Sequence, residues 1–350
     1  MGGYGGWGQP SVRPQGGTCP LRPRGWSNGA MTRLGYQIPN FTYPDVGPDR
    51  LFDAVVAQAK EADAAGFDTV LVMDHFYQLP MMGAPDDFML ECYALLSALA
   101  RETTNVRLSA LVTGNTYRNP AILAKTVTTL DVVSGGRAQL GIGAGWYELE
   151  HDAFGIEFGS FTDRFEKLEE ALQIIGPMLR GERATLAGQH YRTVDAVNSP
   201  PVLGRIPVMI GGAGERKTLR LVAQYADESN LICGPTEVPR KLAALAEHCA
   251  QLGRERTDLT VSWQRTACIA PTMEEAQADL SAYFDRRGVA AAERAQFADM
   301  VHVGDPDTVG ELLAAELALG VDGFTINAPA NGHIPGRVEL LGRTAAAVVG

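Results

Sequence analysis

The sequence lacks the patterns that would assign it to several large classes of protein. Its five cysteines are odd in number and widely spaced, and no two form a CxxC pair, which argues against a disulfide framework or a zinc knuckle and favours a reduced, cytoplasmic protein. No apolar stretch approaches the ~20 residues that span a bilayer, so we expect no membrane partner. Basic residues number 30 against 41 acidic ones, giving a formal charge of −11, so we expect no nucleic-acid partner either.

The first thirty residues contain no aspartate, glutamate or lysine and are dominated by glycine, proline and arginine. They show no helix or strand periodicity and cannot bury enough apolar area to offset the entropy of ordering. A secretory signal would need an apolar core that this segment does not have. We interpret residues 1–30 as a disordered tail or an over-long start, with Met31 opening the folded chain.

Short, unbroken apolar runs alternate with helical patterns from residue 34 onward. Such runs, bounded by turns, are typical of strands buried on both faces of a parallel sheet. Eight principal strands are predicted, at 34–38, 69–73, 106–112, 137–142, 207–210, 228–232, 260–269 and 322–327. Because eight βα units in one direction favour a closed barrel over an open sheet, we predict an α/β fold, a (β/α)8 TIM barrel formed by residues 31–350 as a single domain.

Helices are predicted between these strands, and one interval is too long for a simple connection. The expected helices begin near Asp49 and cover 120–133, 162–180, 215–226, 237–252, 273–298, 307–319 and 335–348, with a brief additional strand at 300–303. The stretch 181–205 exceeds an ordinary connection between helix and strand, so we interpret it as an inserted hairpin or lid after the fourth helix.

The active site of such a barrel lies at the carboxyl ends of its strands, so polar residues directly after each strand are the first candidates. Asp74, His75 and Phe76 follow the second strand. A carboxylate beside an imidazole can move a proton in a cleft, which makes His75 the candidate catalytic residue. The alternative is that Asp74 caps a turn and His75 is structural.

The loops after the third and fourth strands are rich in glycine and small polar residues. Thr113 and Asn115 follow the third strand, where the backbone could approach a flat ligand closely. The run GIGAGW after the fourth strand has Trp146 where the dinucleotide fingerprint requires glycine, so we reject a Rossmann site. A bare backbone wall at Gly143 and Gly145, beside Trp146, suits a planar ring instead.

Charged residues follow Tyr147 on the same loop. Glu148, Glu150 and His151 could be taken for metal ligands, but no fourth ligand is evident, and we interpret them as a solvated loop without a metal.

The glycine-rich run after the fifth strand fails the P-loop pattern, because Arg216 stands where that pattern has glycine. Successive glycines nevertheless expose backbone amides, and a helix starting near Glu215 would present the positive end of its dipole to an anion. We therefore predict a phosphate site, and the alternative is an ordinary glycine-rich turn. The residues of this predicted site are Gly211, Gly212, Gly214 and Glu215.

These motifs, in this order and spacing, resemble the luciferase-like monooxygenase superfamily. DHF, LVTGNTYRNP, GIGAGW and IGGAG follow strands two to five, and the likeness covers residues 33–348. The phrases GGRAQLGIGAGWYELEHDAFGI and RFEKLEEALQII are similar to the bacterial branch of coenzyme F420-dependent oxidoreductases. The resemblance implies a flavin or 5-deazaflavin across the barrel mouth with its phosphate at the strand-five glycines, and a homodimer, because dimers are common in the family.

The resemblance also implies roles for single residues. Asp74 matches a cofactor contact, and His75 matches a proton-donating histidine of sugar-phosphate dehydrogenases in that branch. Ala110 and Leu111 match a strand bulge, often with a non-prolyl cis peptide bond, that bends the deazaflavin. Trp146 stands where those dehydrogenases have a catalytic glutamate, so their substrate and mechanism are not carried over. Further cofactor contacts are assigned to Thr113, Asn115, Gly143, Gly145, Gly211, Gly212, Gly214 and Glu215.

The resulting hypothesis is hydride transfer between coenzyme F420 and an unidentified small organic substrate, with His75 supplying a proton. The substrate would occupy a pocket bounded by Phe76, Trp146, Tyr147 and the insertion 181–205. An alternative is a two-component FMN-dependent monooxygenase, because either ring fits the same wall. A further alternative is a non-catalytic flavin or deazaflavin binding protein.

Overall fold

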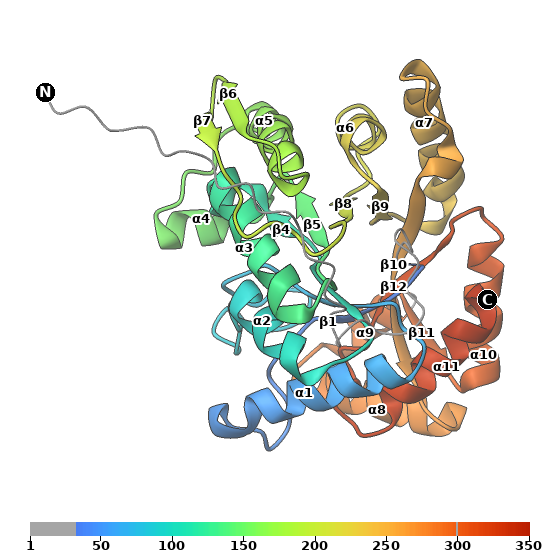
Figure 1. Cartoon of the computed structure of the whole chain (residues 1–350). Coiled ribbons are helices and arrows are strands. Elements are labelled where there is room, and N and C mark those ends of the chain that lie inside the picture. The colour runs from blue at the N-terminus through green and yellow to red at the C-terminus, as the bar shows by residue number, and fades with distance from the viewer. Residues whose placement is uncertain (1–32, 299) are drawn as a thin grey trace, which may run out of the picture.

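The computed structural model describes residues 33–298 and 300–350, so the tail predicted at 1–30 lies outside the described residues. One ten-stranded sheet forms the centre of the fold (Figure 1). Its strands are β1 (Leu34–Ile38), β2 (Thr69–Val72), β3 (Arg107–Ala110), β4 (Thr113–Gly114), β5 (Leu140–Gly143), β8 (Val208–Gly211), β9 (Glu228–Leu231), β10 (Thr260–Ile269), β11 (Val301–Gly304) and β12 (Gly323–Asn327).

The sheet curves into a barrel, as the sequence predicts. Its strands pair in parallel in the order β3-β2-β1-β12-β10-β9-β8-β5-β4, with β11 beside β10. The first strand therefore lies next to the last. A parallel bridge between Leu108 in β3 and Ala138, just before β5, brings the two ends of this order together.

The third strand of the barrel is interrupted where β3 ends and β4 begins. A non-prolyl cis peptide bond joins Leu111 to Val112, one residue later than the bulge that the resemblance implies at Ala110 and Leu111. A Cβ atom on Gly143 or Gly211 would lie 2.9 Å or 2.8 Å from the Val112 side chain. These glycines therefore give room to Val112, and the wall predicted as bare at Gly143 is covered by it.

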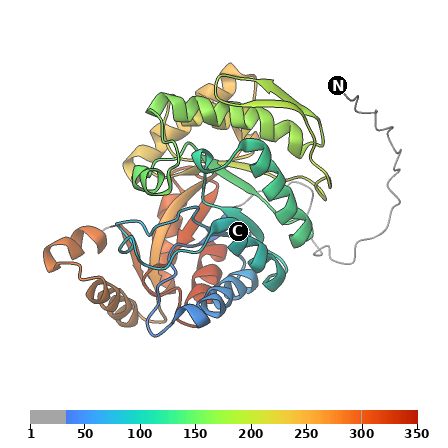
Figure 2. The same cartoon turned by 90° about the vertical axis from the view of Figure 1, so that its left-hand side faces the viewer.

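Helices surround the barrel (Figures 1 and 2). They are α1 (Pro48–Ala64), α2 (Cys92–Glu102), α3 (Pro120–Ser134), α4 (Glu148–Phe154), α5 (Phe161–Leu179), α6 (Thr218–Tyr225), α7 (Val238–Gln251), α8 (Met273–Arg286), α9 (Ala291–Ala298), α10 (Pro306–Leu317) and α11 (Arg337–Val349). Among the described residues, none of these helices is long and apolar enough to cross a membrane.

Four details of the helices differ from the sequence prediction. Helices α2 and α4 were not predicted, and α6 begins at Thr218 and not near Glu215. The helix predicted at 273–298 is two helices, because Gly288 adopts a left-handed φ of +63° between α8 and α9.

The insertion at 181–205 contains an antiparallel hairpin of β6 (Ala184–Ala187) and β7 (Arg192–Ala196). The hairpin lies along α5 in both views (Figures 1 and 2). The Glu170 carboxylate of α5 accepts hydrogen bonds from three successive backbone amides of the hairpin, at 2.7–3.0 Å. The Tyr191 hydroxyl lies 3.5 Å from Asn115 Nδ2, so the insertion reaches the loop that follows the third strand.

Aspartates close the amino ends of the strands. Asp68 accepts hydrogen bonds from the amides of Arg33 and Leu34 at 3.0 Å and 2.9 Å. Asp227 and Asp322 likewise accept the amides at the starts of β8 and β10, at 2.9 Å and 2.8 Å. Each aspartate precedes one strand and holds the start of a neighbouring one, which fixes the register of the barrel.

Helix α8 packs over the end of β10 with a small apolar cluster of its own. Tyr283 and Phe284 of α8 contact Cys268 of β10 and Ala330, which follows β12. This cluster is separate from the main core between barrel and helices. It therefore holds α8 beside the carboxyl ends of the strands.

Candidate active site

His75 lies at the carboxyl end of β2 and is bonded to a buried glutamate. Its Nδ1 atom lies 2.8 Å from the Glu150 carboxylate, and its side chain is 12% exposed. Because Nδ1 faces a carboxylate, it carries a proton, and Nε2 is the ring nitrogen available for exchange. The structure therefore places the sequence-predicted catalytic histidine as an oriented imidazole at the barrel mouth.

Glu150 is the main site residue that the sequence interpretation missed. It lies in α4 with no exposed surface, although its segment was interpreted as a solvated loop. Its carboxylate accepts hydrogen bonds from the Tyr117 hydroxyl and from the amides of Phe76 and Tyr77. Burial acts to raise the pKa of Glu150, but the hydrogen bonds from His75, Tyr117 and Tyr77 outweigh burial and hold the pKa below its usual value.

Aromatic rings surround this pair. The rings of Trp146 and Tyr147 each meet the His75 ring edge-on at 5.8 Å, and they stack on each other at 5.1 Å. Trp146 is 59% exposed, whereas Tyr147 is buried and its hydroxyl has no hydrogen-bond partner among the described residues. Phe76 instead packs between Tyr117 and Phe154, at 4.8 Å and 4.7 Å. Trp146 and Tyr147 thus border His75, while Phe76 supports the loop from behind.

Asp74 is occupied by contacts within the protein. Its carboxylate pairs with both terminal nitrogens of Arg118, at 2.5 Å and 2.9 Å, and accepts the Gly114 amide at 3.2 Å. Arg118 also bonds Glu91. Burial raises the pKa of Asp74, and Arg118 opposes that rise. Asp74 therefore holds the loops after the second and third strands together and fixes their positions at the barrel mouth.

The loop after the third strand places Thr113 and Asn115 near this ion pair. The Thr113 hydroxyl is buried and bonds the Tyr93 hydroxyl at 2.6 Å. Asn115 is 1% exposed, and its Oδ1 atom has no hydrogen-bond partner in the described part of the chain. A buried acceptor without a partner is costly, so a ligand that donates a hydrogen bond would satisfy Asn115.

The glycine-rich loop after β8 offers free backbone amides. The Gly212 amide bonds the Asn230 carbonyl at 2.9 Å, whereas the described residues provide no backbone acceptor for the amides of Ala213 and Gly214. A Cβ atom on Gly214 would lie 2.9 Å from Thr218 Oγ1, so the loop approaches the start of α6 closely. Within residues 33–298 and 300–350, no side chain caps that helix start. The loop and the helix start together suit an anion.

Two charged residues of this loop, Glu215 and Lys217, contact other parts of the protein. Glu215 pairs with Lys241 at 2.9 Å and with Arg240 at 3.2 Å, both on α7. Lys217 lies over the rings of Phe161 and Phe165 on α5. The free amides, and not these side chains, therefore provide the sites for an anion.

A profile of the luciferase-like monooxygenase family matches residues 32–323, which is most of the chain. The chain belongs to this family. Within this family it is 28% identical, over 82% of its length and 89% of the relative, to an F420-dependent glucose-6-phosphate dehydrogenase of Nocardia farcinica.

Solved structures share the luciferase-like fold at low sequence identity. An F420-dependent secondary alcohol dehydrogenase in complex with an F420–acetone adduct superposes with a TM-score of 0.74, at 18% identity, over 91% of this chain and 99% of the other. The oxygenating constituent of 3,6-diketocamphane monooxygenase from Pseudomonas putida, in complex with FMN, gives 0.70 at 19% identity, over 90% and 98%. At these identities the likeness shows the barrel fold.

Glu150 and His151, which the sequence analysis considered as possible metal ligands and did not adopt, have partners within the protein. Glu150 bonds His75, while His151 is buried between the Tyr147 carbonyl and the Thr116 hydroxyl, at 2.8 Å and 2.7 Å. A different set, Asp163, Glu166 and His190, has ligand atoms within 4.8 Å of one another where the hairpin meets α5. A helix cap at Asp163 and the contact between His190 and Glu166 account for that arrangement.

Proposed function

We propose that the chain is an F420-dependent oxidoreductase that transfers a hydride between the deazaflavin and a small organic substrate. The observation that carries this proposal is the His75–Glu150 pair, which orients an imidazole at the carboxyl end of β2. The family match and the similarity to an F420-dependent dehydrogenase support the choice of cofactor. The glucose-6-phosphate substrate of that relative is not part of the proposal, because the family resemblance places Trp146 where such dehydrogenases have a catalytic glutamate.

The residues at the mouth fit a planar cofactor with an anionic tail. Asn115 presents a buried acceptor that has no partner in the described part of the chain, and no backbone acceptor there binds the amides of Ala213 and Gly214, which could bind a phosphate. Gly145, with a φ of +81°, places the backbone beside Trp146. A deazaflavin bound there would supply two-electron hydride chemistry.

The chain's own groups would then control the proton and the solvent. His75 exchanges a proton through Nε2, the nitrogen remote from Glu150, and can in this way deliver a proton to the substrate or receive one. Glu150 fixes the tautomer and orientation of the imidazole. Trp146 and Tyr147 cover the other side of His75 and limit the access of water.

The test is a fluorescence titration of the purified protein with F420 and with FMN. We expect micromolar F420 affinity and weaker FMN binding. Asn115→Ala should weaken F420 binding about fivefold or more, because a buried hydrogen bond contributes about 1 kcal/mol. Asn105→Ala, an exposed asparagine at the amino end, is the matched control and should leave the affinity unchanged.

Preference for FMN would instead favour a two-component monooxygenase. Binding of either cofactor without turnover in any donor or acceptor screen would favour a non-catalytic binding protein. Binding of neither would overturn the proposal. We further propose that the enzyme acts in the cytoplasm as a homodimer and has no nucleic-acid partner, in keeping with its net charge of −11.

A further inference from the structure

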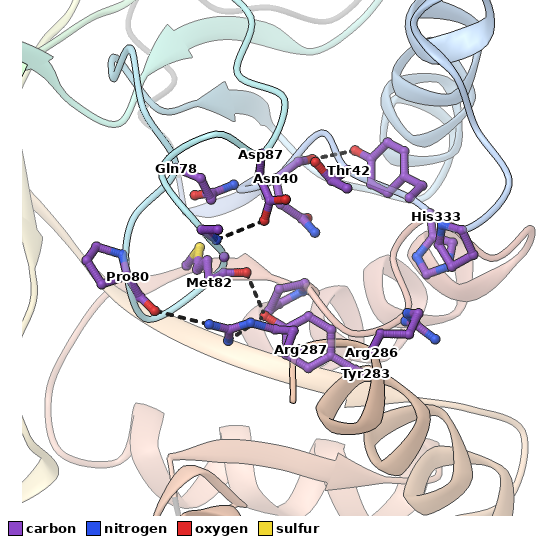
Figure 3. Close-up of a pocket in the computed structure, with 15 residues that line it drawn as sticks. Asn40, Thr42, Gln78, Pro80, Met82, Asp87, Tyr283, Arg286, Arg287 and His333 are labelled. Atoms are coloured by element: carbon purple, nitrogen blue, oxygen red, sulfur yellow. Dashed lines mark hydrogen bonds between the residues drawn. The ribbon is translucent and has the colours of Figure 1, made fainter. Parts of the chain in front are cut away.

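A cavity of about 530 Å³ opens on the carboxyl side of the barrel, between α8 and the loops after β1, β2 and β12 (Figure 3). Gln78, on the same loop as His75, forms part of its wall. The next residue on that loop, Leu79, belongs to the apolar cluster around Tyr147, the ring that meets His75. Neither His75 nor Trp146 lines the cavity, but the loop after β2 connects it to the proposed site of proton transfer, and its size is that of a small-molecule pocket.

One cation of this pocket, Arg286, has no partner among the described residues. Arg286 lines the cavity from the end of α8, and the structure gives it no hydrogen bond or ion pair with any described residue. Its neighbour Arg287 is engaged, because it donates hydrogen bonds to the carbonyls of Pro80 and Met81 and lies over the Tyr283 ring. Arg287 therefore ties α8 to the β2 loop, while Arg286 keeps its donors free.

The other titratable groups of the pocket, Asp87 and His333, add no further positive charge to it. Asp87 lines the cavity and accepts the Ala84 amide at 3.0 Å. His333 stacks on Tyr43 at 5.4 Å. Burial lowers the pKa of His333, and Arg286 lowers it further, so the imidazole is neutral at pH 7. The pocket thus holds one uncommitted positive charge, with a carboxylate nearby that disfavours a doubly charged anion.

The remaining surface is suited to an organic molecule. Asn40 is 8% exposed, and its side chain extends into the cavity without a hydrogen bond to the described residues (Figure 3). The stacked rings of Tyr43 and His333 and the side chain of Met82 provide apolar walls. A ligand with an apolar body and one anionic end matches this combination.

We propose that this pocket binds the substrate and that the substrate is a small organic carboxylate held by Arg286. The assignment of this ligand as the substrate rests on the proposed function. A guanidinium offers two parallel donors to a carboxylate, which matches a singly charged group. Asn40 supplies a further hydrogen bond, and the carboxylate end lies against α8 so that the body of the substrate extends toward His75.

The test is calorimetric titration of the full chain with benzoate and with benzamide, its neutral isostere, with and without saturating F420. Benzoate should bind at least about tenfold more tightly than benzamide, because a charge-assisted pair contributes ~1.5–3 kcal/mol. Arg286→Ala should weaken benzoate binding by about the same factor and leave benzamide binding unchanged. Arg183→Ala, another exposed arginine without a partner among the described residues, is the control and should change neither.

The outcomes separate the two proposals. Equal affinity for benzoate and benzamide, or tighter Arg286-dependent binding of phenyl phosphate than of benzoate, would overturn the carboxylate assignment. An equal loss in the Arg183→Ala control would also overturn it. Failure of F420 to bind, with Arg286-dependent benzoate binding intact, would refute the proposed function and leave an anion site without its catalytic role.

Discussion

The two ends of the barrel differ in how fully their polar groups are hydrogen-bonded within the protein. At the amino ends, aspartates are saturated with hydrogen bonds from the protein; Asp63, for example, accepts the amides of Thr104, Asn105 and Val106 at 2.7–3.0 Å. At the carboxyl ends, polar atoms remain without partners among the described residues, including Asn115 Oδ1 and the Tyr147 hydroxyl. Saturated groups stabilise the fold, and open groups keep their bonding capacity for a ligand.

The two buried carboxylates at the barrel mouth differ in a similar way, because their partners differ. Asp74 and Glu150 are 1% and 0% exposed, but Asp74 faces an arginine and Glu150 faces a histidine. Arginine stays charged, so the first pair is fixed, whereas a histidine ring can both donate and accept a proton. Only the second pair is suited to a catalytic cycle.

The largest effect should come from His75→Ala. We expect turnover to fall about 10²–10⁴-fold, the contribution of a positioned acid or base, while F420 affinity changes little. The assay would use a substrate found by screening for F420 bleaching. Asp63→Ala, at the amino end, should leave the turnover of the folded protein unchanged. An equal loss of turnover and F420 affinity in His75→Ala would make His75 a binding residue.

Glu150→Gln should have a smaller effect on turnover, about tenfold, because the imidazole remains but loses the carboxylate that orients it. The decisive measurement is the pH profile of kcat/KM, which should shift along the pH axis because the charge beside His75 is gone. Tyr117→Phe removes one donor to the same carboxylate and keeps its charge. A profile unchanged in Glu150→Gln would show that Glu150 has only a structural role.

Most of the barrel can be predicted from the sequence because a strand buried on both faces is a continuous apolar run. Strands β1 and β10 begin and end at the predicted residues. Helix α4 was missed because its seven residues give few turns over which a helical period can be recognised. Helix α2 has eleven residues with an apolar period at Leu95, Leu96 and Leu99, so the sequence does carry a signal for it. The break between α8 and α9 depends on Gly288, which within a long helical pattern gives only a weak signal.

Site residues that directly follow a strand could be predicted, because their place in the sequence determines their place in the barrel. His75 follows a strand, and strand ends meet at the barrel mouth. Glu150 could not be found in this way, because its partners His75 and Tyr117 are distant in sequence and the surrounding acidic residues suggest solvent. The one local signal in the sequence is Gly155, because glycine commonly follows the last residue of a helix. In the structure α4 ends there, and Gly155 has a φ of +68°. Arg286 likewise becomes notable only when the fold shows that none of the described residues pairs with it.

At the amino end, Asp63→Ala should lower the free energy of unfolding by about 1–3 kcal/mol, because it leaves three backbone amides without their acceptor. Chemical denaturation would measure this change. Asp86→Ala, an exposed aspartate on the β2 loop, is the control and should change the stability by less than about 0.5 kcal/mol. A comparable loss in both variants would contradict the structural role given to the amino-end aspartates.

The smallest effect is the pH dependence of that stability difference. Burial acts to raise the pKa of Asp63, but the amide hydrogen bonds of Val106, Thr104 and Asn105 outweigh it and hold the pKa below its usual value. A lowered folded-state pKa gives stability that is present above the unfolded value of about 3.9 and is lost as the pH falls through the folded value. The difference between the wild type and Asp63→Ala should therefore be constant from pH 7 to about 5 and shrink below about pH 4. If the difference grew on acidification, the hydrogen-bonded form would be the protonated one, and the amino end would not be held by a charged carboxylate.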